Sequence, residues 1–191
     1  MLDGVAIGRI AVNPVLERGD GAVVHDRILL HVDVVVAGVG NLLRGDDGFG
    51  VVVAQRLEAA GPPPGVRVLD VGIGGIHLVQ ELLEPTDALI IVDAVDLGRP
   101  PGTVMVIRPD VAQPAGPDDL ADVHYATPER ALMLAGALDV LPPATWIVGC
   151  QPVDADALGD GLSPEVEAAV EPAVAGVRRL LAELGLSSPD A

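Results

Sequence analysis

The chain has one cysteine, Cys150, so an internal disulfide framework is excluded. A single thiol is typical of proteins from a reducing compartment, and we therefore expect a cytoplasmic location. Aromatic residues are nearly as scarce, with one Trp, one Tyr and one Phe among 191 residues, although 50% of the chain is hydrophobic. The chain is long enough for one well-buried domain, whose core we expect to consist mainly of Ala, Val and Leu.

Long apolar runs are also missing. The run from Val32 to Val39 is interrupted by Asp33 and is far shorter than the roughly 20 residues that a membrane-spanning helix needs. The first residues contain no basic region followed by an apolar stretch and a cleavage site, so no signal peptide is expected. We therefore expect no membrane partner.

Lysine is absent, and the eleven basic residues, all Arg, face 28 acidic residues, for a formal net charge of −17. Such a surface repels phosphate backbones and anionic lipids, which argues against nucleic-acid and membrane partners. Solubility alone would account for this charge, and so would attraction to a basic partner segment. Composition does not choose between the two.

Five apolar, β-branched runs predict buried strands, and several of the segments between them have helical periodicity. The strands are Val32 to Ala37, Val66 to Val71, Ala88 to Asp93, Thr103 to Arg108 and Thr145 to Val148. The helices are about Asp47 to Ala60, Ile76 to Leu83, Pro128 to Leu138 and a last one from Ser163. This alternation predicts an α/β fold: a single domain with a five-stranded, mostly parallel, twisted sheet sandwiched between helices on both faces.

The predicted domain spans residues 31–186, after an N-terminal extension of residues 1–30 without assigned function and before a tail at 187–191. Two helices have clear apolar faces. The first should bury Phe49, Val52, Val53, Leu57 and Ala60, and the last should bury Val166, Val170, Val177, Leu181 and Leu184. Pro172 should kink or split the last helix, because proline lacks a backbone donor and clashes with the preceding turn.

The segment from Gly38 to Gly50 begins like a dinucleotide-binding turn, with a strand that runs into Gly-x-Gly. The third glycine of that pattern is missing, because position 43 is Leu. Asp46 and Asp47 also occupy the helix start where a pyrophosphate would bind. A nucleotide-binding α/β enzyme is therefore the less favoured alternative. We expect Asp46 to cap the helix, whereas Asp47 is a candidate site residue.

Two further residues fall where sheets of this class build their sites. Asp93 ends an apolar strand, a position where a carboxylate is unfavourable unless it is paired or used. His124 follows a Pro- and Asp-rich loop and precedes a helix. With Asp47 they would supply two oxygens and one nitrogen, a set that suits a divalent transition metal with open coordination positions. Capping by Asp93 and a structural role for His124 remain the alternatives.

At this point the sequence resembles the hydrogenase maturation endopeptidases, over about Val34 to Leu184. Four blocks carry the resemblance: Gly38 to Gly50, Asp70 to Gly75, Val92 to Asp96 with Pro101 to Thr103, and His124 with Val148 to Pro152 and the closing helix. Their shared order makes chance a poor explanation.

The resemblance implies a sheet between helices and an endopeptidase that removes the C-terminal extension of a nickel-loaded [NiFe]-hydrogenase large-subunit precursor. It implies that Asp47, Asp93 and His124 contact the nickel. The nickel would be carried by the substrate, and the enzyme would have no cofactor of its own. The alternative from another class is a non-proteolytic binding module for metalloprotein maturation, which would use the same three residues.

For catalysis we expect Asp47 or Asp93 to act as general base on a water molecule, without assigning the role to one of them. The substrate cleft is expected to be shaped by Gly40, Asn41, Asp70, Gly72, Gly74 and Gly75. We expect Cys150 to be a buried structural thiol and His77 to serve packing or lie on the surface. His25 and His31 receive no role.

Overall fold

A computed structural model describes residues 32–111 and 128–186. Its strands are β1 (Val34–Val39), β2 (Val66–Gly72), β3 (Ala88–Ala94), β4 (Val104–Ile107) and β5 (Ala144–Cys150). Its helices are the 3-10 turn η1 (Gly45–Gly48), α1 (Phe49–Ala59), α2 (Gly75–Glu81), α4 (Pro128–Ala137), α5 (Pro164–Glu167) and α6 (Val170–Glu183). Each predicted element is present and differs only at its ends. The predicted N-terminal extension, the tail, His25, His31 and His124 lie outside the described residues.

The five strands form one sheet in the order β2-β1-β3-β5-β4. Strand β1 pairs in parallel with β2 and β3, and β3 pairs in parallel with β5, while β4 is antiparallel at the edge. This confirms the predicted α/β fold with a mostly parallel sheet. From β1 the chain proceeds to β2 on one side and later to β3 on the other, so the carboxyl ends of β1 and β3 flank a topological switch point. Open α/β sheets commonly bind their ligands at such a point.

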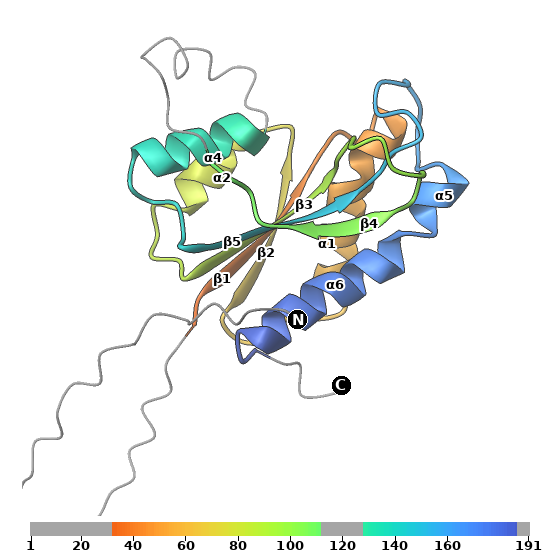
Figure 1. The fold of residues 1–191 in the computed structure, drawn as a ribbon. Coiled ribbons are helices and arrows are strands. Elements are labelled where there is room, and N and C mark those ends of the chain that lie inside the picture. Colours follow the sequence, from red (N-terminus) through yellow and green to blue (C-terminus); the bar gives the residue numbers. More distant parts are fainter. Residues whose placement is uncertain (1–31, 112–127, 187–191) are drawn as a thin grey trace, which may run out of the picture. The chain divides into compact units, whose positions relative to one another are not determined.

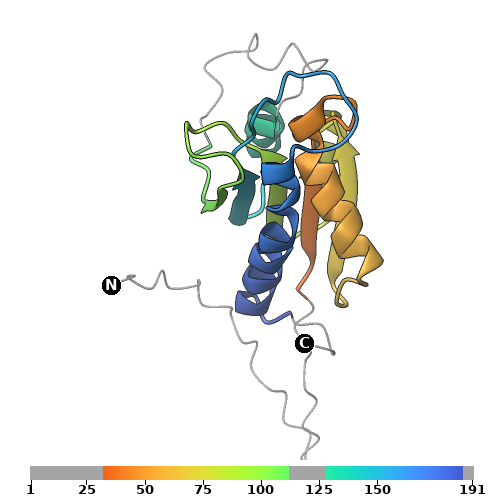
Figure 2. The same cartoon turned by 90° about the vertical axis from the view of Figure 1, so that its right-hand side faces the viewer.

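Helices cover both faces of the sheet (Figure 1). Mostly aliphatic side chains fill the two layers between the helices and the sheet. Helices α1 and α6 lie side by side on one face, as Figure 2 shows, and α2 and α4 pack on the other. Residues of β1 alternate between the layers, with Val34 and Val36 toward α1 and α6. The prediction that Ala60 is buried with the apolar face of the first helix was wrong. Ala60 is exposed and lies beyond the end of α1 at Ala59.

Pro172 splits the last helix, as predicted. Helix α5 ends at Glu167 and α6 begins at Val170, so the break lies at residues 168–169. Residue 168 is four positions before Pro172 and is the one whose carbonyl a proline ring would meet in a continuous helix. The predicted apolar stripe is confirmed at Val166, Val170, Val177 and Leu181, which are buried. No helix in residues 32–111 or 128–186 is long and apolar enough to cross a membrane.

Candidate functional site

Glycines allow the first turn of α1 to lie directly against the ends of β1 and β3. A Cβ atom at Gly50 would collide with the backbone oxygens of Val92 and Val39, and one at Gly38 would collide with the backbone oxygen of Gly50. Gly40 has a φ of 133°, and a Cβ there would collide with the backbone oxygen of Asp47. Close backbone packing therefore accounts for these glycines without any bound phosphate, and it brings η1 over the end of β3.

Asp47 lies in η1, above the end of β1, and is half-buried. Its Oδ2 accepts a hydrogen bond of 3.0 Å from the backbone N–H of Asn41. Burial raises the pKa of Asp47 above its ordinary value, and the negative charge of Asp156 acts in the same direction. The Asn41 amide and the Arg44 guanidinium oppose that rise without cancelling it. The Asp47 side chain is thus held in place by the Asn41 amide, but its surroundings still disfavour the charged carboxylate.

Asp93 is the sixth residue of β3 and pairs in register with Gly149 of β5. Burial raises the pKa of Asp93 to about 8, and the negative charge of Asp47 adds to the rise. A hydrogen bond from the Ala94 amide lowers it again, and the charge of Glu129 raises it. Asp47 and Asp93 are therefore electrostatically coupled at the switch point. Without a cation between them, one carboxyl of the pair holds a proton near neutral pH.

The structure thus brings together two of the three predicted metal ligands, since His124 lies outside the described residues. Within residues 32–111 and 128–186, no group of three or more His, Cys, Asp or Glu side chains is arranged to hold a metal ion. Glu129, in the first turn of α4, was not predicted to belong to the site although its charge acts on Asp93. Its position soon after His124 was the one available signal for it.

Asp46 has a different role from its neighbour. Its side chain is buried and accepts hydrogen bonds from the backbone N–H groups of Val153 (2.8 Å), Asp154 (3.4 Å) and Ser163 (2.7 Å) and from the Ser163 hydroxyl (3.0 Å). Burial raises the pKa of Asp46, but these hydrogen bonds outweigh it and hold the pKa below its ordinary value. The expectation that Asp46 caps the following helix was wrong: it fastens the β5–α5 loop to η1.

Of the residues predicted to shape the cleft, Asp70 and Gly72 lie in the last part of β2, and the others follow β1 or β2. The Gly40 N–H donates to the Gly72 carbonyl at 2.9 Å, which joins the two loops. The Asn41 side chain accepts from the Leu43 N–H at 3.0 Å. Gly72 has a φ of 55°, Gly74 donates to the Val71 carbonyl, and Gly75 begins α2. Asp70 is exposed and accepts a long hydrogen bond, 3.4 Å, from Gln55. Their contact with a substrate remains a prediction.

Gln151 is a second residue at this edge of the sheet that was not predicted to matter. Its buried side chain accepts hydrogen bonds from the backbone N–H groups of Leu97 (2.8 Å) and Arg99 (3.0 Å) and donates one to Asp96 (2.8 Å). It therefore orders the loop that follows Asp93. The available signal was an amide side chain directly after an apolar strand.

The other candidate groups have structural roles. Cys150 is fully buried, and burial, followed by the charge of Asp46, raises the pKa of its thiol to about 11. The thiol is therefore protonated and a poor nucleophile, which confirms it as a structural residue. His77 is half-exposed on α2 and lies 3.5 Å from Glu81, one turn further along the helix. Of the two roles expected for His77, packing or surface, the structure confirms the surface position.

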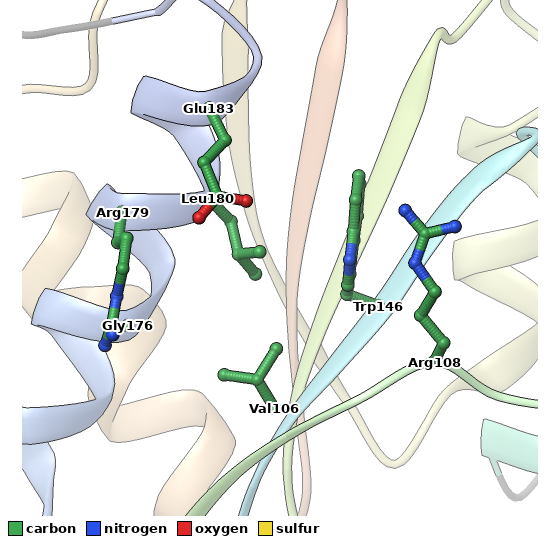
Figure 3. A pocket seen from close by; sticks show the side chains of 7 residues that line it. All are labelled: Val106, Arg108, Trp146, Gly176, Arg179, Leu180 and Glu183. Carbon is green, nitrogen blue, oxygen red and sulfur yellow. The ribbon is translucent and has the colours of Figure 1, made fainter. Parts of the chain in front are cut away.

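A cavity of about 320 Å³ lies elsewhere, between α6 and strands β4 and β5 (Figure 3). The Arg108 guanidinium lies 4.8 Å from the centre of the Trp146 ring in its wall. The cavity is lined by Val106, Arg108, Trp146, Gly176, Arg179, Leu180 and Glu183. It contains none of the candidate site residues, so the coupled aspartates belong to a different region.

Comparison with known proteins agrees with this fold. Residues 51–179 match the family described as hydrogenase maturation protease. The hydrogenase expression/formation protein HupM of Azotobacter chroococcum is 37% identical over 155 residues, which are 81% of this chain and 74% of that protein. The hydrogenase maturating endopeptidase HybD from E. coli has a TM-score of 0.66 at 30% identity, with 82% of this chain and 96% of that chain covered.

A hydrogenase 2 maturation peptidase from Thaumarchaeota archaeon SCGC_AB-539-E09 has a TM-score of 0.59 at 35% identity, covering 78% of this chain and 97% of that chain. Together these matches define the protein as a peptidase with an α/β fold. More narrowly, the chain belongs to the hydrogenase maturation protease family.

Proposed function

We propose that the protein removes the C-terminal extension of a nickel-loaded [NiFe]-hydrogenase large-subunit precursor in the cytoplasm. The nickel in the precursor is the recognition element, and the enzyme has no metal or cofactor of its own. Asp47, Asp93 and His124 contact the nickel. The observation that carries this proposal is the coupled pair of half-buried carboxyls at the switch point, where the charge of Asp47 raises the pKa of Asp93.

Electrostatics favours a cationic group on this pair. Two nearby carboxylates repel each other, and a positive ion between them removes the repulsion and stabilises both ionised forms. Nickel in the precursor is such a cation, and carboxylate oxygens with an imidazole nitrogen suit its coordination. The names of the matched relatives, which include maturating endopeptidases of hydrogenases, support the choice of substrate.

The proposed contact serves recognition and positioning. A precursor without nickel offers the aspartates no cation, so it binds weakly and escapes cleavage. A precursor with nickel is held with its scissile bond at a fixed distance from the site, which lowers the entropic part of the barrier. Asp47 or Asp93 then acts as general base on a water molecule, and the nickel is available to polarise the scissile carbonyl. The protonated Cys150 thiol does not compete for this role.

The test compares nickel-loaded and nickel-free large-subunit precursor, with the mass of the large subunit as the measurement. We expect cleavage of the loaded precursor only. Asp47→Asn, Asp93→Asn and His124→Ala should each reduce processing by at least about a hundredfold, in the range of lost acid–base catalysis. Asp139→Asn is the control, since Asp139 is an exposed acid after α4 with a φ of 58°, which Asn tolerates.

Equal cleavage of both precursors would reject nickel as the recognition element. Tight binding of the loaded precursor without cleavage would instead favour a non-proteolytic maturation module.

A further inference from the structure

The loops at the carboxyl ends of the strands expose an unusual amount of apolar surface. Leu43 is 68% exposed, Ile73 73% and Leu158 86%. Six large apolar side chains in the loops after β1, β2, β3 and β5 form what we call the apolar rim: Leu42, Leu43, Ile73, Leu97, Val153 and Leu158. They belong to the same edge of the sheet as Asp47 and Asp93.

The apolar rim is held in place by contacts between its loops. The Leu43 carbonyl accepts a hydrogen bond from Gly159 (3.2 Å), the residue after Leu158, and Gly45 donates to the Gly159 carbonyl (3.0 Å). An ion pair of 2.9 Å joins Arg44 to Asp156 beside this pair of bonds. The exposed leucines therefore project from a cross-linked backbone, so little conformational entropy would be lost when a partner covers them.

The other loops are tied into the same edge. Gly72, next to Ile73, accepts the hydrogen bond from Gly40. Gln151 orders the loop that contains Leu97, and Asp46 accepts from the Val153 amide. The result is a set of exposed apolar side chains on ordered loops, at the same edge of the sheet as the coupled aspartates. Surfaces of this kind on soluble proteins mark interaction sites.

Charge indicates which partner fits. The same loops contain the acidic residues Asp96, Asp154, Asp156 and Asp160, besides Asp93 near the end of β3 and Asp47 in η1. Their basic residues are Arg44 and Arg99, of which Arg44 is paired with Asp156. A second copy of this chain would place like charges against like charges, which disfavours association. A protein surface that is apolar and flanked by basic residues is complementary.

We propose that the apolar rim is the docking surface for the folded precursor, which contacts it through an apolar patch flanked by basic side chains. This inference rests on the proposed function and adds to it a binding contribution that is independent of nickel. The precursor first docks on the apolar rim, and Asp47 and Asp93 then contact the nickel if the precursor contains it.

The test separates binding from cleavage in the full-length protein. The double variant Leu43→Ser/Leu158→Ser should raise the Kd and the KM for a purified nickel-loaded precursor by about tenfold or more, with the effect on KM and not on kcat. The matched control is Leu83→Ser/Leu138→Ser, because these leucines are 61% and 52% exposed but follow α2 and α4, at the amino edge of the sheet. The control should keep the wild-type Kd. Thermal midpoints of both variants should match the wild type, since all four side chains are exposed.

Four outcomes decide between the proposals. Unchanged binding by the rim variant, or equal loss in the control, overturns the docking surface even if cleavage proceeds. Precursor that binds the wild type through the rim but is not cleaved overturns the proposed protease function and supports docking. Absence of both binding and cleavage overturns both. A wild-type dimer that the rim substitutions dissociate overturns the precursor as occupant and identifies a second copy.

Discussion

Two regions of the molecule differ in the kinds of residue that they contain. We call the loops at the carboxyl ends of the strands the edge, and the sheet with its packed helices the body. At the edge, glycines occupy points where backbone meets backbone, the charge of Asp47 acts on Asp93, and leucines remain exposed. In the body, aliphatic side chains such as Val36, Ile90 and Val148 are fully buried between sheet and helices. The body is built for stability, whereas the edge accepts unfavourable charge and exposed apolar surface. That division is expected where a site is placed on a stable scaffold.

Gly50 offers the largest test of this comparison, because it lies where the edge meets the body. Gly50→Ala should reduce the free energy of unfolding by about 3 kcal/mol, since the new methyl group meets backbone oxygens of Val92 and Val39 that cannot move without disrupting β1 and β3. Chemical denaturation gives the value. Processing should fall as well, because η1 must shift and carry Asp47 away from Asp93.

Gly159→Ala is the control for Gly50→Ala, since its Cβ would meet nothing within 4 Å. It should change the free energy of unfolding by less than about 0.5 kcal/mol, as surface substitutions usually do. If Gly50→Ala is equally mild, α1 approaches the strand ends less closely than the structure shows.

The pH dependence of unfolding tests whether the charge of Asp93, at the edge, lowers the stability of the folded protein. An ordinary Asp pKa is 3.8, but the folded protein holds the Asp93 pKa at about 8. Between these values the unfolded chain releases the proton and the folded chain keeps it, so stability falls as pH rises from about 4 to 8 and then levels off. Asp93→Asn cannot ionise. The variant should therefore be more stable than the wild type at pH 8, and this gain should vanish near pH 4.

Urea denaturation of wild type and Asp93→Asn at several pH values measures this difference. Asp46→Asn is a control of opposite sign. The folded state holds the pKa of Asp46 low, so its carboxylate contributes stability above the ordinary pKa, and that contribution is lost as pH falls through the folded value. Asp46→Asn should therefore destabilise the protein at neutral pH. An Asp93→Asn gain that is constant across pH would mean that ionisation is not its cause.

Local patterns predicted the body better than the edge. Aliphatic runs predicted the strands, and Pro172 predicted the break in the last helix. Both predictions succeeded because the burial of a strand and the backbone geometry around a proline depend on only a few neighbouring residues. Asp93 was predicted as a site residue because an acid at the end of an apolar strand is unfavourable unless it is paired or used, and this role stays a prediction. The role of Asp46 was missed because its partners Val153 and Ser163 follow it by more than a hundred residues. Gln151 was missed for a similar reason, since Leu97 and Arg99 precede it by more than fifty.

The smallest expected effect comes from a glycine in the body, Gly176 of α6, which borders the cavity in Figure 3. Its Cβ would lie 3.8 Å from Cγ1 of Val148, an ordinary van der Waals contact, and its backbone is helical. Gly176→Ala should therefore stabilise the protein by about 0.5–1 kcal/mol through helix propensity and leave processing unchanged. Denaturation and precursor cleavage measure the two results. The opposite signs of Gly50→Ala and Gly176→Ala, in two helices on the same face, would place the boundary between edge and body at the first turn of α1. A loss of stability in Gly176→Ala would show that close backbone packing extends to α6.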